Sequence, residues 1–359
     1  MSTKSDGMNY VPEGGAERVV DAGEFVFAAA HLDHGHINAQ ATGLIQAGGV
    51  LKYVYDPDAA KVTAFREQFP DVTPVSSLDE ILDDDGVHLV AAAAIPCDRG
   101  PIGVKVMDGG KDYFTDKAPF TTMGQLEDAR AAVTRTGRRF FVYFSERLHN
   151  ESAYRAGELI HEGAIGRVLQ VLGIAPHRLA KPTRPDWFFR KRQYGGIITD
   201  IGSHQFEQFL HYASATDATV NFARVANLAN PDVPELEDFG EASLTTDNGA
   251  SCYLRVDWFT PDGQSVWGDG RTFVLGEKGT MELRKYTDVA RDSSGDIIFL
   301  CDADGEREIP CSGRVGFPFF GQVILDSLNG TEDAMTQDHI FKAAELSLRA
   351  QAFADAAQV

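Results

Sequence analysis

The sequence has 359 residues, which is enough for two domains of ordinary size. Its formal net charge of -20 argues against a nucleic-acid partner and against docking on an anionic membrane, because both need a basic face. The four cysteines form no C-x-x-C pair, and no run reaches the roughly 20 apolar residues of a membrane helix. We therefore expect a cytoplasmic protein with reduced thiols.

The first 24 residues are polar and lack the apolar segment of a signal peptide, so we expect an N-terminal arm. From residue 25 to residue 148, apolar runs suited to buried strands alternate with segments of helical periodicity. This alternation is typical of crossover units and predicts a Rossmann-type parallel sheet that binds a dinucleotide. In chain order, the expected strands are residues 25–30, 50–55, 88–95, 113–115 and 140–144, with helices around 37–45, 61–69, 77–82, 102–107 and 122–137.

Residues 149–359 follow another pattern, in which strand candidates succeed one another with turn signals such as the Asp-Asn-Gly at 247–249. This pattern predicts a C-terminal α+β domain with a large, mostly antiparallel sheet, and hence an α/β chain overall. A basic, proline-containing loop spans residues 176–193. The expected strands are residues 168–174, 218–227, 242–246, 251–259, 271–275, 280–285 and 297–301, with helices at 152–162, 321–328 and 339–357.

The turn after the first strand is where an open parallel sheet would hold the phosphates of a dinucleotide. The usual fingerprint there is G-x-G-x-x-G, whereas this chain has Ala30, Leu32 and Gly35 at the three glycine positions. Gly35 suits close packing of the following helix. Leu32 stands where the backbone normally approaches phosphate, and Asp33 adds a negative charge, so the turn departs from the standard motif.

Asp56 ends the second expected strand, about 20 residues after Gly35, where an acidic residue is expected to hold the adenosine ribose hydroxyls. Its carboxylate would repel a 2'-phosphate, and no arginine follows it, so we expect NAD, with NADP as the less favoured cofactor. The structural alternative is that the stretch Asp56-Pro57-Asp58 forms a turn and a helix cap.

Three histidines, His31, His34 and His36, surround Asp33 and raise the possibility of a metal site, because imidazoles and a carboxylate can hold zinc. A glycine and a helix start interrupt the run, and no further ligand run accompanies it. We therefore expect no metal and interpret these histidines as the lining of a cofactor loop.

Two further segments carry residues suited to catalysis. Lys117, in the stretch Asp-Lys-Ala-Pro at 116–119, directly follows a strand and would point into the ligand crevice. In the stretch of residues 195–205, two glycines precede Asp200 and His204, which share one face if the segment is helical.

At these residues the sequence resembles the Gfo/Idh/MocA family (glucose-fructose oxidoreductase, inositol dehydrogenase and rhizopine catabolism), over nearly the whole chain from Phe25 onward. Residues 116–119 stand where the family has E-K-P, and residues 195–204 match its G-G-x-x-x-D-x-x-x-H motif. Residues 163–166 match its G-x-I-G, and residues 275–280 resemble its late glycine turn. Asp98 and Arg99, after Pro96 and Cys97, depart from the family's threonine-proline-asparagine stretch.

The resemblance implies a reaction and a role for each catalytic candidate. His204 would take the hydroxyl proton while hydride leaves the same carbon for the nicotinamide. Lys117 would stabilise the developing alkoxide, and Asp200 would orient neighbouring hydroxyls. We therefore expect hydride transfer between a hydroxyl carbon of a sugar, glycoside or polyol and NAD. The cofactor would contact Ala30, His31, Leu32, Asp33, His34, Gly35, His36, Ile37, Asp56, Ile95, Pro96, Asp116 and Lys117.

Other polar residues lie where a substrate would be recognised. Glu146 and Arg147 follow the sixth strand, and the basic loop carries further candidates that could form a lid, although a charged surface loop is the alternative. The full set of expected substrate contacts is Glu146, Arg147, His177, Arg178, Trp187, Asp200 and His204. By resemblance we also expect a homodimer or homotetramer formed through the open face of the second sheet.

Three alternative functions remain compatible with the sequence. A related enzyme could hold NAD through a redox-neutral cycle of glycoside processing. A regulator could have kept sugar and NAD binding without turnover, which the leucine-bearing turn would favour. A histidine-metal hydrolase would contain stoichiometric zinc and bind no nicotinamide.

Overall fold

The computed structural model describes residues 7–9, 14–291 and 295–357, and it forms two compact units. The first unit, which we call the Rossmann unit, comprises Met8–Tyr143 and Gly316–Phe341. The second, which we call the sheet unit, comprises Phe144–Val315 and Lys342–Val359. The chain passes from the Rossmann unit to the sheet unit between Tyr143 and Phe144, and residues 316–341, which the sequence assigned to the C-terminal domain, belong with the Rossmann unit.

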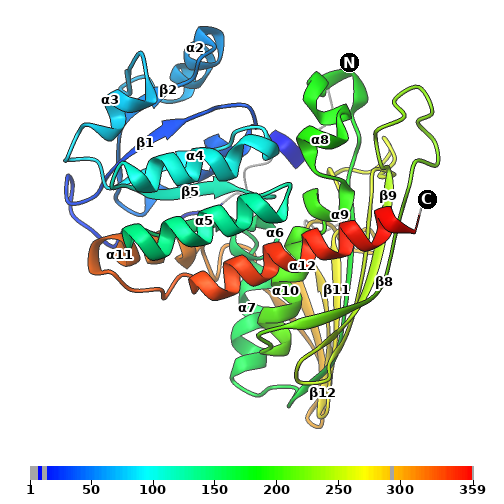
Figure 1. Cartoon of the computed structure of the whole chain (residues 1–359). Coiled ribbons are helices and arrows are strands. Elements are labelled where there is room, and N and C mark those ends of the chain that lie inside the picture. The colour runs from blue at the N-terminus through cyan, green and yellow to red at the C-terminus, as the bar shows by residue number, and fades with distance from the viewer. Residues whose placement is uncertain (1–6, 10–13, 292–294, 358–359) are drawn as a thin grey trace. The chain divides into compact units, whose positions relative to one another are not determined.

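The Rossmann unit contains a six-stranded parallel sheet in the order β3-β2-β1-β4-β5-β6, which confirms the predicted architecture. Its central strands, β1 and β4, are buried and carry no charged residue. This is expected when helices cover both faces of a parallel sheet. The helices α4 and α5 lie side by side along this sheet (Figure 1). The strands are β1 Val26–Ala30, β2 Val50–Tyr55, β3 Thr73–Pro74, β4 Leu89–Ala92, β5 Asp112–Asp116 and β6 Phe140–Tyr143.

Local signals set the ends of the helices in this unit. The Ser77 side chain accepts a hydrogen bond from the Glu80 amide, and Thr122 does the same for Gln125, as the capping spacing predicts. Gly137 ends α5 with a φ of 68°, which glycine adopts without steric cost. The helices are α1 His36–Gln46, α2 Ala59–Gln68, α3 Leu78–Leu82, α4 Pro96–Asp108, α5 Met123–Thr136 and α11 Pro318–Asn329.

Part of the expected N-terminal arm lies on the Rossmann unit itself. The amide of Val19 donates to the carbonyl of Ala47 at 3.0 Å, and Val20 is buried. Gly321 of α11 lies so close to Val19 that a Cβ there would meet it at 2.8 Å. The arm's residues 1–6 and 10–13 lie outside the described residues, and Gly7–Asn9 forms the short helix η1.

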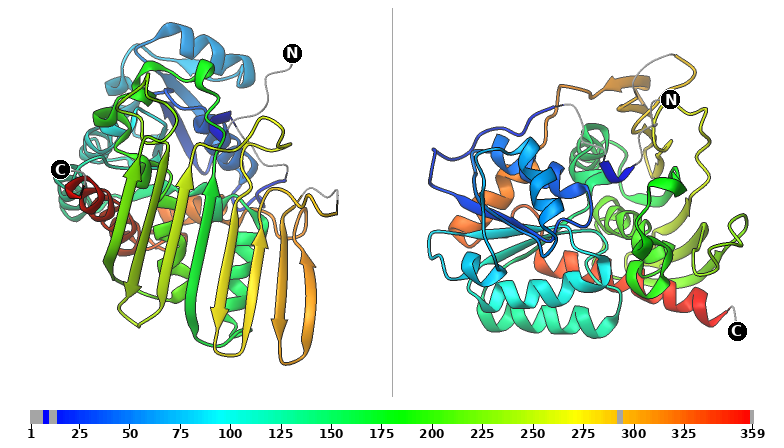
Figure 2. Two further views of the ribbon diagram at one scale, coloured as in Figure 1. Left: turned by 90° about the vertical axis from the view of Figure 1, so that its right-hand side faces the viewer. Right: turned by 90° about the horizontal axis from the view of Figure 1, so that it is seen from above.

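The sheet unit contains an eight-stranded sheet in the order β14-β13-β12-β11-β7-β10-β9-β8, in which β7 and β10 are parallel and the other pairs antiparallel. This confirms a mostly antiparallel sheet, shown face-on in Figure 2, left. Strands β3 and β14 were not anticipated. The strands are β7 Val168–Pro176, β8 Ala218–Ala226, β9 Phe239–Thr246, β10 Ser251–Asp257, β11 Arg271–Gly276, β12 Gly279–Arg284, β13 Ile297–Asp302 and β14 Gly305–Pro310.

The two faces of this sheet differ in what covers them. Gly173 of β7 lies against Gln205 and Phe209 of α10, so one face packs on helices. The preceding residue, Leu172, points to the opposite face, because successive side chains of a strand alternate between the two faces. It pairs with Phe273 of β11 on this open face. The remaining elements of this unit are α6 Ser145–Leu148, α7 Glu151–His161, η2 Lys181–Thr183, η3 Asp186–Phe189, α8 Lys191–Tyr194, α9 Ile197–Asp200, α10 Ser203–Ala213 and most of α12 Gln337–Ala356.

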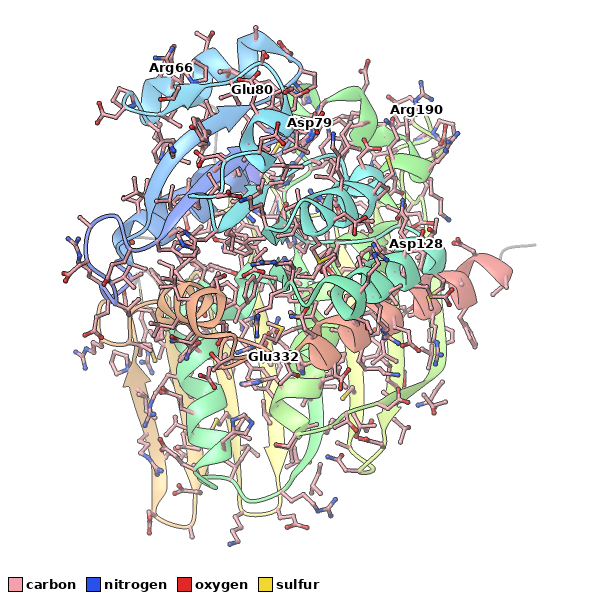
Figure 3. The ribbon with its side chains drawn as sticks, turned by 60° about the vertical axis from the view of Figure 1, so that its left-hand side comes forward. Arg66, Asp79, Glu80, Asp128, Arg190 and Glu332 are labelled. Atoms are coloured by element: carbon pink, nitrogen blue, oxygen red, sulfur yellow. The ribbon has the colours of Figure 1, made fainter. Side chains whose placement is uncertain are left out.

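Exposed helix faces carry part of the acidic surplus. In the Rossmann unit, Asp79 and Glu80 of α3 and Asp128 of α5 are exposed, as is the basic Arg66 of α2 (Figure 3). Among the described residues, no helix combines the length and apolar character that crossing a membrane requires.

Candidate active site

The loop from His31 to Gly35 joins β1 to α1 at the carboxyl end of the parallel sheet. Its backbone is tied to both neighbouring strands, because the His31 amide donates to the Tyr55 carbonyl at 3.0 Å and the Ala93 amide donates to the His31 carbonyl at 3.1 Å. The His34 amide also donates to Ala93, at 2.9 Å. The nonstandard turn is therefore held at the edge where a dinucleotide-binding sheet receives its ligand.

Asp56, at the end of β2, is buried and supports the same turn. Its Oδ2 accepts a hydrogen bond from the Leu32 amide at 2.6 Å, and its Oδ1 accepts one from the Asp58 amide at 2.8 Å. Each carboxylate oxygen can accept a second hydrogen bond, so Asp56 can still bind ribose hydroxyls. The turn and helix cap that the sequence suggested as an alternative are present, with Asp58 as the N-cap of α2, and they coexist with a capacity for ligand binding at Asp56.

Asp33 does not join the neighbouring histidines. Its Oδ1 lies 2.5 Å from the Nζ of Lys61 on α2, and the same Nζ lies 3.8 Å from Asp56 Oδ1. The sequence did not predict this contact of Lys61. Lys61 lies on α2, and its side chain reaches the loop only because α2 packs beside it. This cation compensates the negative charge that Asp33 would otherwise bring to the turn.

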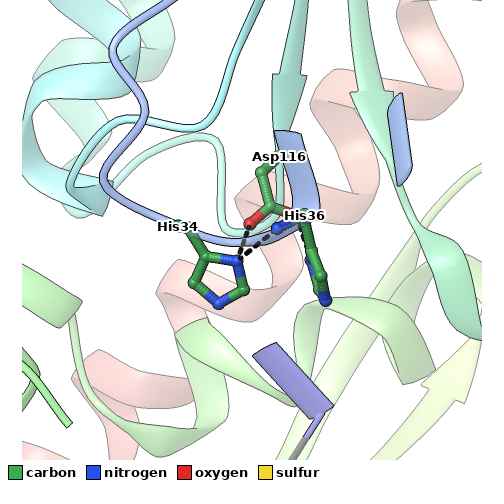
Figure 4. A group of neighbouring side chains, drawn as sticks. All are labelled: His34, His36 and Asp116. Atoms are coloured by element: carbon green, nitrogen blue, oxygen red, sulfur yellow. Dashed lines mark hydrogen bonds and ion pairs between the residues drawn. The ribbon is translucent and has the colours of Figure 1, made fainter. Parts of the chain in front are cut away.

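His34 and His36 instead converge on Asp116, the last residue of β5 (Figure 4). The His36 Nδ1 lies 2.9 Å from Asp116 Oδ1, and the His34 Nδ1 lies 3.3 Å from Asp116 Oδ2. All three side chains are buried, and the Arg99 Nη2 donates to Asp116 Oδ2 at 3.1 Å. The loop, α1, α4 and β5 therefore meet in one buried polar network.

The protonation states in this network follow from burial and charge. Burial lowers the pKa of His34 well below its usual range, and the neighbouring His36 lowers it further. Burial alone would raise the pKa of Asp116, but His36 and Arg99 hold it well below the usual carboxyl range. A neutral His34 beside an ionised Asp116 is the arrangement that these interactions favour.

The same three side chains could offer ligands to a metal, since their donor atoms lie within 4.8 Å of one another. However, the guanidinium of Arg99 already contacts one carboxylate oxygen, and the Lys117 amide donates to the other at 2.8 Å. A second cation beside Arg99 would be repelled at close range. The contacts therefore favour a hydrogen-bonded network over a metal centre.

Lys117 directly follows this network and is 6% exposed. Its peptide bond to Ala118 is cis. Arg99 Nη1 donates to the carbonyl oxygens of both residues, and Arg99 Nε donates to the Ala94 carbonyl at 2.7 Å. Ile95 and Pro96, also expected near the cofactor, form the N-cap and first residue of α4, the helix that carries Arg99.

In the sheet unit, the segment in which Asp200 and His204 would share one face of a single helix is divided into α9 and α10. Gly195 and Gly196 have φ angles of 91° and 94°, which require glycine here, and they turn the chain into α9. α9 ends at Asp200, and α10 begins at Ser203, whose hydroxyl donates to the Asp200 carbonyl at 3.0 Å. Asp200 is 9% and His204 is 2% exposed.

Glu146, which follows β6, is buried in a polar cluster of the same unit. Its Oε2 accepts hydrogen bonds from Gln205 at 2.8 Å and from the Nζ of Lys285 at 3.3 Å, and its Oε1 lies 4.0 Å from His177 Nε2. Lys285 also donates to Gln208, whose amide donates to the His204 carbonyl. Burial lowers the pKa of Lys285, and Glu146 opposes this shift.

The other expected substrate residues lie in different settings. Arg147 forms a buried ion pair with Glu207 of α10, with its Nε 2.7 Å from Oε1. Arg178 donates to the carbonyls of Pro261, Gln264 and Val266. The ring of His177 contacts the rings of both Trp258 and Trp267, and Trp187 contacts Phe188.

Sequence reasoning did not anticipate Arg99 or Lys285 as members of these clusters. For Arg99 the sequence offered a weak indication, because a charged residue closely follows the long uncharged strand expected at residues 88–95. Lys285 carried no signal, since it reaches Glu146 across 139 positions of sequence.

Comparisons with known proteins point to one family for both units. Residues 22–144 match a family model described as "Oxidoreductase family, NAD-binding Rossmann fold", and residues 154–282 match the "GFO/IDH/MocA C-terminal domain". A crystal structure of an oxidoreductase candidate from Erwinia carotovora atroseptica is 47% identical, with a TM-score of 0.89 over 92% of this chain and 99% of that chain.

Two further proteins are more distant. The scyllo-inositol 2-dehydrogenase (NAD(+)) of Bacillus subtilis is 28% identical over 232 residues, which are 61% of this chain and 63% of that protein. A levoglucosan dehydrogenase in complex with NADH and levoglucosan is 17% identical, with a TM-score of 0.75 over 93% of this chain and 98% of that chain. This second likeness shows a common fold.

Proposed function

Because the chain belongs to the Gfo/Idh/MocA family of oxidoreductases, we propose that it transfers hydride between a hydroxyl-bearing carbon of a sugar, glycoside or polyol and NAD. The observation that carries this proposal is the presence of two groups of motif residues: Lys117 directly after β5, and Asp200 at the end of α9 with His204 at the start of α10. The inositol and levoglucosan dehydrogenases noted above support the substrate class.

The Rossmann unit has the features that NAD binding requires. The amino end of α1 follows the loop at Gly35 and offers the positive end of a helix dipole to the pyrophosphate. Asp56 has acceptor capacity for the ribose hydroxyls, and Lys61 offsets the charge of Asp33. Leu32 is tied back to Asp56 through its amide, so the loop is ordered without the usual glycines. Bound NAD would supply the hydride acceptor.

The chain's own groups would handle the proton and the oxygen. His204 would accept the proton of the substrate hydroxyl, since imidazole is a competent base near neutral pH. Lys117 would donate a hydrogen bond to the reacting oxygen and stabilise its negative charge. Asp200 would accept hydrogen bonds from a neighbouring hydroxyl and thereby fix which carbon faces His204.

We also propose that Glu146, Arg147, His177, Arg178 and Trp187 contribute to substrate recognition. Glu146 has the clearest support, because its buried Oε1 lacks a hydrogen-bond partner among the described residues and can accept from a hydroxyl. Arg147 and Arg178 act through the residues they hold, since their guanidinium groups already bind Glu207 and backbone carbonyls.

Turnover with a panel of substrates tests the proposal. The purified protein should form NADH when it is mixed with NAD and inositols, monosaccharides or glucosides. Lys117→Ala and His204→Ala should each lower kcat by at least about 1,000-fold while leaving NAD affinity within about threefold. The control Lys105→Ala removes an exposed lysine that pairs with Asp79, and it should retain full activity.

Other outcomes would redirect the assignment. Release of free sugar from a glycoside without net NADH would indicate the redox-neutral cycle, and NAD binding without any turnover would indicate a regulator. Stoichiometric zinc without nicotinamide binding would support the hydrolase. Full activity in both the Lys117 and His204 variants would contradict the catalytic roles proposed above.

We propose that the protein acts in the cytoplasm as a homodimer or homotetramer that covers the open face of its eight-stranded sheet. The apolar side chains of Leu172, Phe273, Leu275 and Phe299 line a hollow on this face, and Phe273 and Leu275 are exposed. An exposed apolar face of this kind is commonly covered by another chain. Sedimentation at micromolar concentration should show an oligomer, and a monomer would contradict this proposal.

A further inference from the structure

We propose that Arg99 is a positioning residue for Lys117, and that it holds the backbone of the lysine's motif in place through its guanidinium. This inference rests on the function proposed above, because positioning matters only if Lys117 contacts the reacting oxygen. Arg99 lies in the first turn of α4, the helix that follows the central strand β4. It does not belong to any of the motifs that suggested the reaction.

The contacts of Arg99 span the whole motif. Its Nη1 donates to the carbonyl oxygens of Lys117 and, at 3.2 Å, Ala118. Its Nη2 donates to the Asp116 carboxylate, and its Nε donates to the carbonyl of Ala94, two residues beyond the end of β4. The side chain is 1% exposed. One rigid group therefore connects the segment after β4 to three consecutive residues, namely the last residue of β5 and the two that follow it.

The motif is also held from its other side. The Lys117 amide donates to Asp116 Oδ1 at 2.8 Å, while the Lys117 carbonyl accepts from Arg99. Both backbone polar groups of Lys117 thus have fixed partners within the Rossmann unit. Since the amide and carbonyl define the orientation of the Cα–Cβ bond, these contacts restrict the region that the lysine's Nζ can reach.

The position of Arg99 itself is fixed by close packing. The next residue, Gly100, leaves so little space that a Cβ there would meet Phe120 at 3.0 Å and Gln125 at 3.1 Å. Gln125 in turn donates to the Cys97 carbonyl at 2.7 Å. The first turn of α4 is therefore clamped between the segment after the motif and α5.

Only a guanidinium suits this place. It presents its N–H donors in a planar fork, and here that fork meets a carboxylate and three carbonyl oxygens. A lysine ammonium is a point charge on a flexible stem and cannot span the same acceptors. A lysine at position 99 should therefore keep the charge but lose the geometry.

The alternative is that Arg99 merely stabilises the fold, and a matched control separates the two roles. Lys111 is 5% exposed, belongs to the same unit and donates to the Asp84 carbonyl at 2.7 Å. It precedes β5, so it lies at the opposite end of the strand from the motif. Lys111→Ala should lower Tm without a specific effect on catalysis.

The experiment compares Arg99→Ala, Arg99→Lys and Lys111→Ala at equal folded concentration. We expect Arg99→Ala to lower kcat by about 100-fold, with KM for NAD changed by less than about threefold. Millimolar guanidinium should restore part of the kcat of Arg99→Ala, whereas methylammonium should not. The kcat of Arg99→Lys should fall about tenfold. If Arg99→Ala does not fold, this variant alone tests whether Arg99 positions Lys117.

A second readout is independent of turnover. Reductive methylation with a ¹³C label gives each lysine a methyl resonance, and the Lys117→Arg variant identifies that of Lys117. In folded Arg99→Ala and Arg99→Lys this resonance should move toward those of exposed lysines, while in Lys111→Ala it should stay in place. This measurement tests Arg99 even if no substrate in the panel is turned over, an outcome that would count against the proposed reaction alone.

The inference is overturned if kcat and the Lys117 resonance in the Arg99 variants match the wild type. It is also overturned if Lys111→Ala, at the same loss of Tm, lowers kcat as much as Arg99→Ala.

Discussion

Two regions of the molecule hold their polar residues in different ways. One is the carboxyl edge of the parallel sheet. The other is the buried polar cluster of the sheet unit around Glu146, Arg147 and Lys285, which we call the rim. At the parallel edge, Asp56 follows β2 and Asp116 ends β5. Each accepts a hydrogen bond from an amide one or two residues away, and each is also contacted by the loop between β1 and α1. At the rim, Glu146, Lys285 and Gln208 meet from three distant segments. Local turns therefore supply part of the first region, whereas the second is assembled from segments that are distant in sequence.

The comparison predicts that single substitutions at the rim cost the most stability. Glu207→Leu would leave the buried Arg147 cation without its counterion, which should lower the free energy of unfolding by about 3–5 kcal/mol in urea titrations. The double variant Arg147→Met/Glu207→Leu should recover most of that loss, because it leaves no uncompensated charge. A double variant as unstable as the single one would contradict this explanation.

At the parallel edge, the main effect should be on cofactor binding. Asp56→Ala removes an acceptor for ribose hydroxyls and releases the Leu32 amide, so NAD affinity should fall by about 10- to 100-fold. NADP affinity should fall less, because the substitution removes a repelling charge while Lys61 stays nearby. Fluorescence titration with both reduced cofactors measures the ratio, and an unchanged ratio would exclude Asp56 as a selector.

A smaller effect concerns pH. The folded-state pKa of His34 is lowered, so the unfolded chain binds more protons below the ordinary histidine pKa of about 6.5. Stability should therefore fall as pH decreases from about 7 to 5, by at most about 1.4 kcal/mol per pH unit from this group. In His34→Asn the slope should be shallower in denaturant titrations at each pH. An identical slope would show that other groups dominate.

The smallest effect should come from a surface pair. Arg155 of α7 contacts Glu158 and Glu162, and both carboxylates are exposed. Arg155→Ala should change the free energy of unfolding by less than about 1 kcal/mol. A larger loss would mean that solvent-exposed charges contribute to this rim as much as buried ones do.

The sequence was sufficient where the signal is local. The alternation of strands and helices, the caps at Ser77 and Thr122 and the end of α5 at Gly137 all follow from neighbouring residues. It was insufficient where a side chain crosses the fold: Lys61 reaches Asp33, and Arg99 reaches Lys117, only after the helices have packed.

The second region shows the same limit more strongly. Asp200 and His204 would share one face if their segment were a single helix, but the chain divides into α9 and α10 at Ile201 and Gly202, where a Cβ on Gly202 would clash with the Ile198 carbonyl oxygen. Strand β14 escaped notice because its residues are mostly exposed and charged, without the alternation that marks a half-buried strand. Lys285 joins Glu146 through sheet topology that no local pattern encodes.

The most direct test of the proposed chemistry follows a single atom. Polyols and sugars that carry deuterium on carbon should be incubated with NAD and the purified protein, and the nicotinamide should be analysed by mass spectrometry. We predict that one deuterium moves from the substrate carbon to the nicotinamide ring, and that Lys117→Ala and His204→Ala each abolish this transfer. Transfer that persists in both variants, or a protein that never labels the nicotinamide with any substrate of the class, would contradict the account.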